Sequence, residues 1–191
     1  MHATRSTSAA AAVLAGALMA VAIPAAAHAQ APQSPDPAIM ATGDGKYGFS
    51  NLKSAKLLAV AGGSTANGAR IVQNPLALSG GDLISDQNWA ASDAGGGYYS
   101  FRNVRSGKAL GVDGASTAAG AGLIQATPDT SNNQDWRFET SATYPAGVYR
   151  IRNRKSNLCI GIPGASTATG VQAAQFPCDG TQNQGWKLVD N

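Results

Sequence analysis

The chain has 191 residues, a length that suits one domain with short appendages. Charged residues make up 13% of the sequence, glycine occurs 23 times, and Glu139 is the only glutamate. Long surface helices need many charged residues on their solvated faces, so this composition excludes a mainly helical protein and favours short strands joined by tight turns. The formal net charge of +3 is too weak to predict nucleic acid as a partner.

The first 29 residues have the pattern of a secretory signal peptide. His2 and Arg5 give a polar, positive start, an Ala-rich apolar stretch follows, and Ala27-His28-Ala29 supplies the small-x-small pattern that a signal peptidase recognises. A membrane anchor is the alternative, but Pro24 interrupts the stretch and its hydrophobicity is weak. We therefore expect a secreted or periplasmic protein that has no membrane segment after cleavage.

Residues 30–45, with the sequence QAPQSPDPAIMATGDG, are rich in proline, glutamine and small polar residues. Such a composition predicts a flexible linker or tail. Organised structure is expected over residues 46–191.

Three copies of one segment follow this linker. The copies begin at Ser50, Arg102 and Arg152, and each contains a Gly-x-Ser-Thr turn and closes with a Gln-x-Trp motif. These motifs are Gln87-Asn88-Trp89, Gln134-Asp135-Trp136 and Gln184-Gly185-Trp186. The second and third copies align without a gap at an offset of 50 residues, whereas the first has five extra residues before Gln87. A repeat of this period indicates a fold built from homologous units.

Within each copy, apolar residues alternate with polar ones over short runs bounded by Gly, Ser, Asn and Pro, which predicts half-buried strands. An open solenoid of such copies would need polar end caps. Closing three copies about an axis instead removes the exposed sheet edges and gives the copies one shared core. We therefore predict an all-β fold with three lobes, at approximately residues 46–92, 97–140 and 147–191, whose tryptophans lie at equivalent places in the core.

The Gln-x-Trp motifs, with the Gly-x-Ser-Thr turns upstream, resemble the ricin-type β-trefoil lectin domain. The resemblance covers residues 46–191 and implies a β-trefoil of twelve short strands in three homologous four-stranded lobes with pseudo-threefold symmetry. Cys159 and Cys178, both within the third copy, match the intra-lobe disulfide of this family. A disulfide is also the default for an exported chain, and two cysteines without histidine are too few ligands for a metal site. We expect neither a metal nor a cofactor.

The resemblance implies one shallow sugar site per lobe, made of an early Asp, an aromatic ring and the Asn before the Gln-x-Trp glutamine. This sequence departs from that pattern, because the Asp position is Ala59, Gly111 or Gly161 in the three lobes. Among the three positions for the ring, only Phe176 in the third lobe is aromatic. The third lobe is therefore the best candidate for a sugar site.

The candidate carbohydrate-binding residues of that lobe are Phe176 as a stacking platform, Asn183 and Gln184 as amides, and Asp179 in place of the missing acid. Phe176 could instead pack in the core beside the disulfide, and the Gln-x-Trp glutamine could satisfy backbone groups at a turn. In the second lobe, Asn133 keeps the Asn position. Asp113 there is either a turn residue or a displaced ligand.

These patterns predict a secreted, monomeric, lectin-like module that binds a glycan or polysaccharide and is not an enzyme. After cleavage no histidine remains for a Ser-His-Asp triad, and the aspartates show no pattern of the two opposed carboxylates that a glycosidase needs. The alternative is a β-trefoil scaffold that binds a protein partner, as an inhibitor or an adhesion protein, through a protruding loop at residues 76–85. We expect no binding to nucleic acid or to a membrane.

Basic residues cluster near residue 150. Arg150, Arg152 and Arg154 alternate with other residues, which is typical of the solvated face of one strand. A docking patch is the alternative interpretation.

Overall fold

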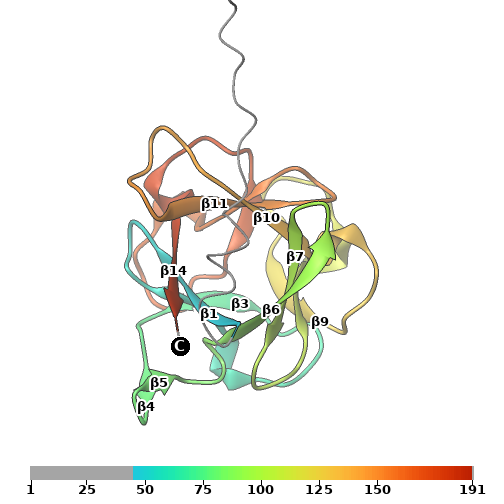
Figure 1. Ribbon diagram of the computed structural model, residues 1–191, viewed down its shortest axis with the longest axis vertical. Helices are drawn as coiled ribbons and strands as arrows, with labels where there is room; N and C mark the ends of the chain where they lie inside the picture. Colours follow the sequence, from blue (N-terminus) through green and yellow to red (C-terminus); the bar gives the residue numbers. More distant parts are fainter. Residues whose placement is uncertain (1–44, 191) are drawn as a thin grey trace, which may run out of the picture. The chain divides into compact units, whose positions relative to one another are not determined.

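The computed structural model describes residues 45–190. The predicted signal peptide, at residues 1–29, and all but the last residue of the predicted linker lie outside the described residues. The described part of the chain consists of β-strands and single-turn 3-10 helices, without an α-helix (Figure 1). In residues 45–190, no helix is long and apolar enough to cross a membrane.

Each repeat copy supplies four strands to one sheet, which has twelve strands within residues 45–190. The strands of the first lobe are β1 (Lys46–Asn51), β2 (Leu57–Val60), β3 (Ile71–Asn74) and β6 (Trp89–Gly95). Those of the second lobe are β7 (Tyr98–Asn103), β8 (Ala109–Val112), β9 (Leu123–Ala126) and β10 (Asp135–Glu139). Those of the third lobe are β11 (Val148–Asn153), β12 (Cys159–Gly161), β13 (Ala174–Phe176) and β14 (Trp186–Asp190).

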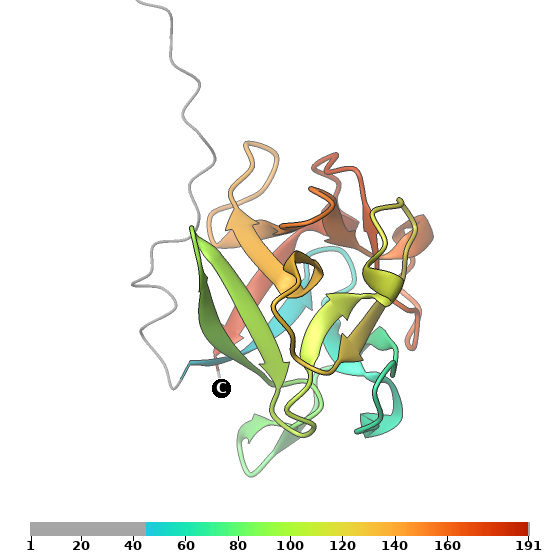
Figure 2. The same ribbon diagram turned by 90° about the vertical axis from the view of Figure 1, so that its right-hand side faces the viewer.

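The first and last strands of every lobe pair into a closed ring. Antiparallel pairing runs through β1, β6, β7, β10, β11 and β14, and β14 pairs in turn with β1. This closure leaves no open edge on the barrel strands, which surround a common centre in two perpendicular views (Figures 1 and 2).

The middle strands of each lobe form hairpins, and single β-bridges link the three hairpins to one another. The bridges are Arg70–Ile124, Val72–Gln172 and Gly122–Ala174. A closed barrel with a cap of three linked hairpins is the β-trefoil fold that the sequence predicts.

The three tryptophans occupy equivalent places in the core. Trp89, Trp136 and Trp186 are all 0% exposed. Each donates its indole N–H to the carbonyl of the second residue in the second strand of its lobe. The acceptors are Leu58 at 3.2 Å, Leu110 at 2.9 Å and Ile160 at 3.0 Å. The equivalent surroundings predicted from the repeat are therefore confirmed.

A buried glutamine from each lobe contacts the lobe that precedes it, and the glutamine of the first lobe contacts the third. Gln73, Gln125 and Gln175 share one repeat position and are 0% exposed. The Nε2 of Gln125 donates to the carbonyls of Ser64 and Ala66, both at 2.9 Å, in the Gly-x-Ser-Thr turn of the first lobe. The other two glutamines make the same pair of bonds, so the contacts run cyclically from lobe to lobe. This network was not predicted from the sequence.

The extra residues of the first copy form a hairpin outside the main sheet. Its strands are β4 (Leu78–Ser79) and β5 (Asp82–Leu83), joined through Gly80 and Gly81. Leu76 and Leu78 are 50% and 56% exposed. The segment projects from the barrel (Figure 1), as predicted for residues 76–85.

Candidate functional site

An open cavity of about 230 Å³ lies on the third lobe. Its lining consists of Ile162, Gly164, Phe176, Pro177, Asp179, Asn183 and Gln184. The structure thus brings together the four residues that sequence analysis selected in this lobe. Ile162, Gly164 and Pro177 were missed. Ile162 could have been predicted from its place in the repeat, because it directly follows Gly161, the glycine at the Asp position of the family.

The Phe176 ring lies in the wall of this cavity. Phe176 ends β13 and is half-buried, outside the common core. Opposite it, a Cβ atom added to Gly161 would lie 3.2 Å from Phe176 Cδ2 and 3.0 Å from Gln184 Cγ. Both separations are shorter than an ordinary van der Waals contact. An acid at position 161 would therefore require the ring or Gln184 to move.

The predicted disulfide between Cys159 and Cys178 is present, with 5.2 Å between the Cα atoms. Cys159 lies opposite Phe176 in the β12–β13 register. The bond therefore ties the turn that carries Pro177 and Asp179 to β12. By the loop-entropy estimate, a cross-link over 19 residues stabilises the fold by about 3 kcal/mol.

The amide of Gln184 bonds to the backbone of the same turn. Its Oε1 accepts from the Asp179 N–H at 3.2 Å, and its Nε2 donates to the Pro177 carbonyl at 2.9 Å. Gln87 and Gln134 make the equivalent bonds in their own lobes. Gln184 therefore supports the cavity by holding its turn, which agrees with the structural alternative considered for this glutamine.

Asn183 and Asp179 each offer an oxygen to the cavity. Asn183 Nδ2 donates to the Ile162 carbonyl at 3.1 Å, and its Oδ1 has no partner within residues 45–190. Oδ1 of the exposed Asp179 accepts from the N–H and hydroxyl of Thr181, at 2.9 and 2.6 Å. Its Oδ2 has no partner in the same range, so the site contains one amide and one carboxylate acceptor.

Tyr144 supports this turn from the segment between β10 and β11. Its hydroxyl donates to the Thr181 carbonyl at 2.9 Å. Burial, assisted by the negative charge of Asp179, raises the pKa of Tyr144 to about 12. The phenol therefore remains a proton donor at every physiological pH.

Asn133 and Asp113 belong to the second lobe and do not line the third-lobe cavity. Asn133 is 5% exposed; its Nδ2 donates to the Val112 carbonyl at 3.4 Å, and its Oδ1 accepts from the Ser131 hydroxyl. Asp113 is exposed at the start of the 3-10 turn Asp113–Ala115. The structure thus leaves these two residues apart from the group around Phe176.

A second cavity, of about 310 Å³, is polar and lies between the β6–β7 hairpin and the turn that precedes β10. Figure 2 shows this hairpin in green. The cavity is lined by Ser92, Asp93, Ala94, Ser100, Arg102, Asp129, Thr130, Asn132, Asp135 and Arg154. Sequence analysis missed it because only closure of the barrel brings these segments together. Residues 45–190 contain no cluster of three or more side chains suited to hold a metal ion.

The closed barrel, its three linked hairpins and the aromatic cavity on one lobe define a lectin-like β-trefoil. The chain belongs to the ricin-type beta-trefoil lectin domain-like family, whose sequence profile matches residues 85–145 and 132–191. No curated protein sequence matches this chain.

Two of the solved structures similar to this chain are identical to it at more than a third of the aligned positions. The designed 3-fold symmetric protein ThreeFoil has 37% identity and a TM-score of 0.70, over 78% of this chain and 100% of that protein. An exo-beta-1,3-galactanase from Clostridium thermocellum has 36% identity and a TM-score of 0.70, but the match covers 78% of this chain and only 31% of the enzyme. The Macrolepiota procera ricin B-like lectin, solved with lactose, has 18% identity and a TM-score of 0.65 over 78% of this chain and 98% of the lectin, and shows the fold alone.

Proposed function

We propose that this chain is a secreted, non-catalytic carbohydrate-binding module whose site is the third-lobe cavity. The observation that carries the proposal is the position of Phe176, whose ring lines one cavity with Asn183 and Asp179. An aromatic face packs against the C–H face of a sugar ring, while amide and carboxylate oxygens accept hydrogen bonds from its hydroxyls. The volume of about 230 Å³ is below the usual range for drug-sized ligands, which favours one sugar unit of a longer glycan.

Galactose-containing glycans are the first ligands to test. The Macrolepiota procera lectin was solved with lactose, and the Clostridium thermocellum enzyme is an exo-beta-1,3-galactanase. Their names support this sugar class only as a starting point for screening. A single small site binds weakly, so a polysaccharide that repeats the sugar is the ligand that would gain most from several modules acting together.

Export and absence of catalysis are part of the same proposal. The pattern of residues 1–29 and the Cys159–Cys178 disulfide both support passage into an oxidising compartment. Cleavage after Ala29 would remove both histidines of the chain, His2 and His28. Sequencing the N-terminus of the exported protein tests this point, and we expect it to begin at Gln30.

The proposal is tested by comparing Phe176→Ala with Asn74→Ala, which changes the equivalent position of the first lobe. After a glycan array has identified a ligand, isothermal titration calorimetry should show that Phe176→Ala weakens binding about tenfold. The variant loses about 1 kcal/mol of aromatic contact together with the apolar surface that the ring buries against the sugar. Asn74→Ala should bind as the unchanged protein does. The proposal would be contradicted if the Phe176→Ala variant bound the glycan as tightly as the unchanged protein does, or if the unchanged protein bound no glycan at all.

A protein partner is the second candidate, favoured by the exposed side chains of Leu76 and Leu78 on the β4–β5 hairpin. Replacing residues 75–86 by the shorter segment 127–133 of the second lobe would remove this hairpin. The second candidate predicts that this replacement abolishes a partner interaction and leaves glycan binding intact. Partner interactions that all survive the replacement would exclude the hairpin as the docking element.

A further inference from the structure

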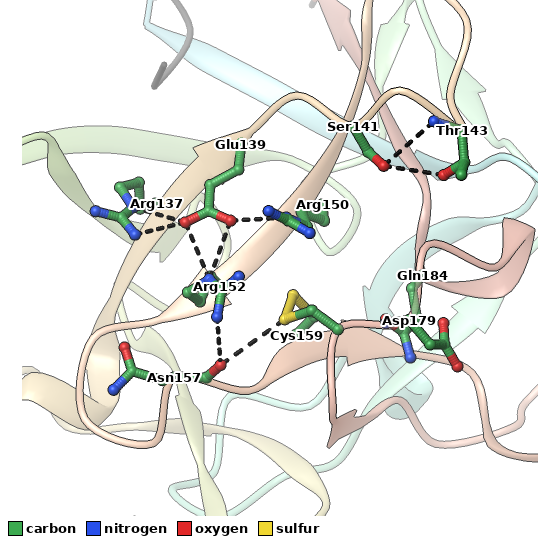
Figure 3. Close-up of polar contacts among 11 residues, drawn as sticks. Arg137, Glu139, Ser141, Thr143, Arg150, Arg152, Asn157, Cys159, Asp179 and Gln184 are labelled. Atoms are coloured by element: carbon green, nitrogen blue, oxygen red, sulfur yellow. Dashed lines mark hydrogen bonds and ion pairs between the residues drawn. A yellow bond between two sulfur atoms is a disulfide. The ribbon is translucent and has the colours of Figure 1, made fainter. Parts of the chain in front are cut away.

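Three arginines surround one carboxylate on the outer face of β10 and β11 (Figure 3). The strand register places Arg137 opposite Arg152 and Glu139 opposite Arg150. The Glu139 side chain is 0% exposed, whereas the three arginine side chains are 21–29% exposed. We refer to Arg137, Arg150 and Arg152 as the arginine triad.

Every member of the triad directs its Nε toward Glu139. Arg137 Nε and Arg152 Nε lie 3.0 and 2.9 Å from Glu139 Oε1, and Arg150 Nε lies 2.7 Å from Oε2. Arg152 also donates through Nη1 to the Asn157 carbonyl at 2.9 Å. Within residues 45–190, neither Nη of Arg150 has a bonding partner, and one Nη of each other arginine is likewise unoccupied.

The charges of this cluster do not cancel. Burial alone would raise the pKa of Glu139, but hydrogen bonds and charges from Arg137, Arg152 and Arg150 outweigh it and hold the pKa below its ordinary value. Glu139 therefore stays ionised, and its single negative charge faces three positive ones. The carboxylate fixes three guanidinium groups while their outer nitrogens keep free donors, an arrangement that suits a bidentate anion.

The Asn157 carbonyl lies between the triad and the turn of the third-lobe cavity. It accepts a hydrogen bond from Arg152 Nη1 at 2.9 Å, and the sulfur of Cys178, next to Asp179, lies 3.7 Å from it. Tyr144 contacts the same turn. Its hydroxyl bonds to the carbonyl of Thr181, whose side chain in turn bonds to Asp179. The pKa of Tyr144 is raised by burial and by Asp179, and the positive charge of Arg150 opposes that rise. The phenol therefore lies within electrostatic range of both Asp179 at the cavity and Arg150 in the triad.

From these contacts we propose that the arginine triad is a second binding site, which takes the carboxylate or sulfate groups of an acidic polysaccharide whose neighbouring sugar occupies the third-lobe cavity. This inference rests on the proposed carbohydrate-binding function for the identity of the ligand. Guanidinium groups match carboxylate and sulfate geometry through paired N–H bonds. Because the Asn157 carbonyl contacts both Arg152 and Cys178, the triad lies beside the turn of the cavity, which favours one chain that contacts both sites over an unrelated anion.

The unmodified protein tests the inference with charge-matched polysaccharides. Polygalacturonate is compared with its methyl ester, and dextran sulfate with dextran, by affinity electrophoresis at increasing salt. We expect each uncharged form to bind about tenfold more weakly than a preferred acidic form, as loss of a charge-assisted contact implies. The difference should shrink as salt screens the triad. The two pairs distinguish a carboxylate ligand from a sulfate ligand.

Two variants assign the effect to the triad. Arg150→Gln should weaken acidic-polysaccharide binding about tenfold, because it removes the arginine with two unoccupied Nη atoms. Lys53→Gln removes the same charge from an exposed turn of the first lobe and should leave binding unchanged. The thermal unfolding midpoint and the affinity for a neutral cavity ligand show whether the Arg150→Gln variant remains folded.

The outcomes separate this inference from the proposed function. Equal binding of charged and methyl-esterified or unsulfated forms by the unmodified protein would overturn the role of the triad and leave the cavity proposal intact. A preference for acidic polysaccharide that is lost in Arg150→Gln but kept in Phe176→Ala would support the triad as an anion site. It would contradict the proposal that the sugar occupies the third-lobe cavity. If the protein binds a single-stranded DNA oligonucleotide as tightly as the preferred acidic polysaccharide, the assignment of the triad to polysaccharide is overturned.

Discussion

Gly161 and Phe176 show how a single residue changes the character of the third-lobe site. The family resemblance places an acid at position 161, whereas a Cβ there would lie 3.2 Å from the Phe176 ring and 3.0 Å from Gln184. Ala59, at the same repeat position in the first lobe, has a Cβ, and there the ring position is Asn74. With the Phe176 ring and Gln184 in their present positions, a side chain at position 161 would therefore require one of them to shift.

Gly161→Ala should test this crowding directly. We expect a loss of unfolding free energy of about 1–3 kcal/mol, because the new methyl group overpacks the contact between the ring and β12. Urea unfolding measures the change. Ala126→Gly, which also changes one methyl group but at a half-buried position of the second lobe, is the comparison. A Gly161→Ala variant as stable as the unchanged protein would show that the space at position 161 is free.

Glu139 gives the stability of the domain a defined dependence on pH. Its pKa in the folded protein lies below the ordinary value of 4.5, so the unfolded chain binds the proton more readily. The stabilisation is therefore present above about pH 4.5 and is lost as the pH falls through the folded-state pKa. We expect Glu139→Gln to flatten this acid dependence, measured by urea unfolding from neutral pH to about pH 3. Parallel curves for the two proteins would contradict this role.

The disulfide and the Gln184 amide act at the scale of one element, the turn over residues 177–181. Both restrain the same turn, the disulfide by bonding Cys178 to β12 and the amide by bonding Pro177 and Asp179. This restraint keeps Phe176 and Asp179 on the same cavity before any ligand arrives. A preorganised turn loses less conformational entropy on binding.

Replacing both cysteines with alanine should therefore affect stability and binding together. We expect the unfolding free energy to fall by about 3 kcal/mol, as estimated for a closed loop of this size. Glycan affinity should also fall, because the turn must be ordered on binding. Calorimetric unfolding and titration measure the two effects. Unchanged affinity in a folded double variant would show that the turn is rigid without the disulfide.

The buried glutamines act between lobes, and Gln125→Ala tests their contribution. This change leaves the carbonyls of Ser64 and Ala66 without their buried donor, so we expect a loss of about 1–3 kcal/mol of unfolding free energy. Gln182→Ala, at an exposed position of the third lobe, is the control and should be neutral. Equal stability of both variants would mean that the carbonyls find other partners.

At the scale of the whole molecule, the fold was predictable because three aligned copies repeat both the apolar alternation and the Gln-x-Trp motif. The third-lobe residues were also predictable, since Phe176, Asp179, Asn183 and Gln184 lie within one short segment of one copy. The roles of the buried glutamines and of the second cavity depend on contacts between lobes, which no local pattern contains. Sequence alternation placed Arg150 and Arg152 on a solvated face, but only the strand register shows that Glu139 lies buried between them.

The central claim is that sugar occupies the third-lobe cavity, and NMR titration of the isotopically labelled protein with a glycan tests it most directly. Backbone amide signals from residues 161–164 and 176–184 should shift on addition of the ligand, while signals from the β4–β5 hairpin should not. Shifts that centre on the hairpin or on the second lobe, with the third-lobe signals unchanged, would contradict the claim.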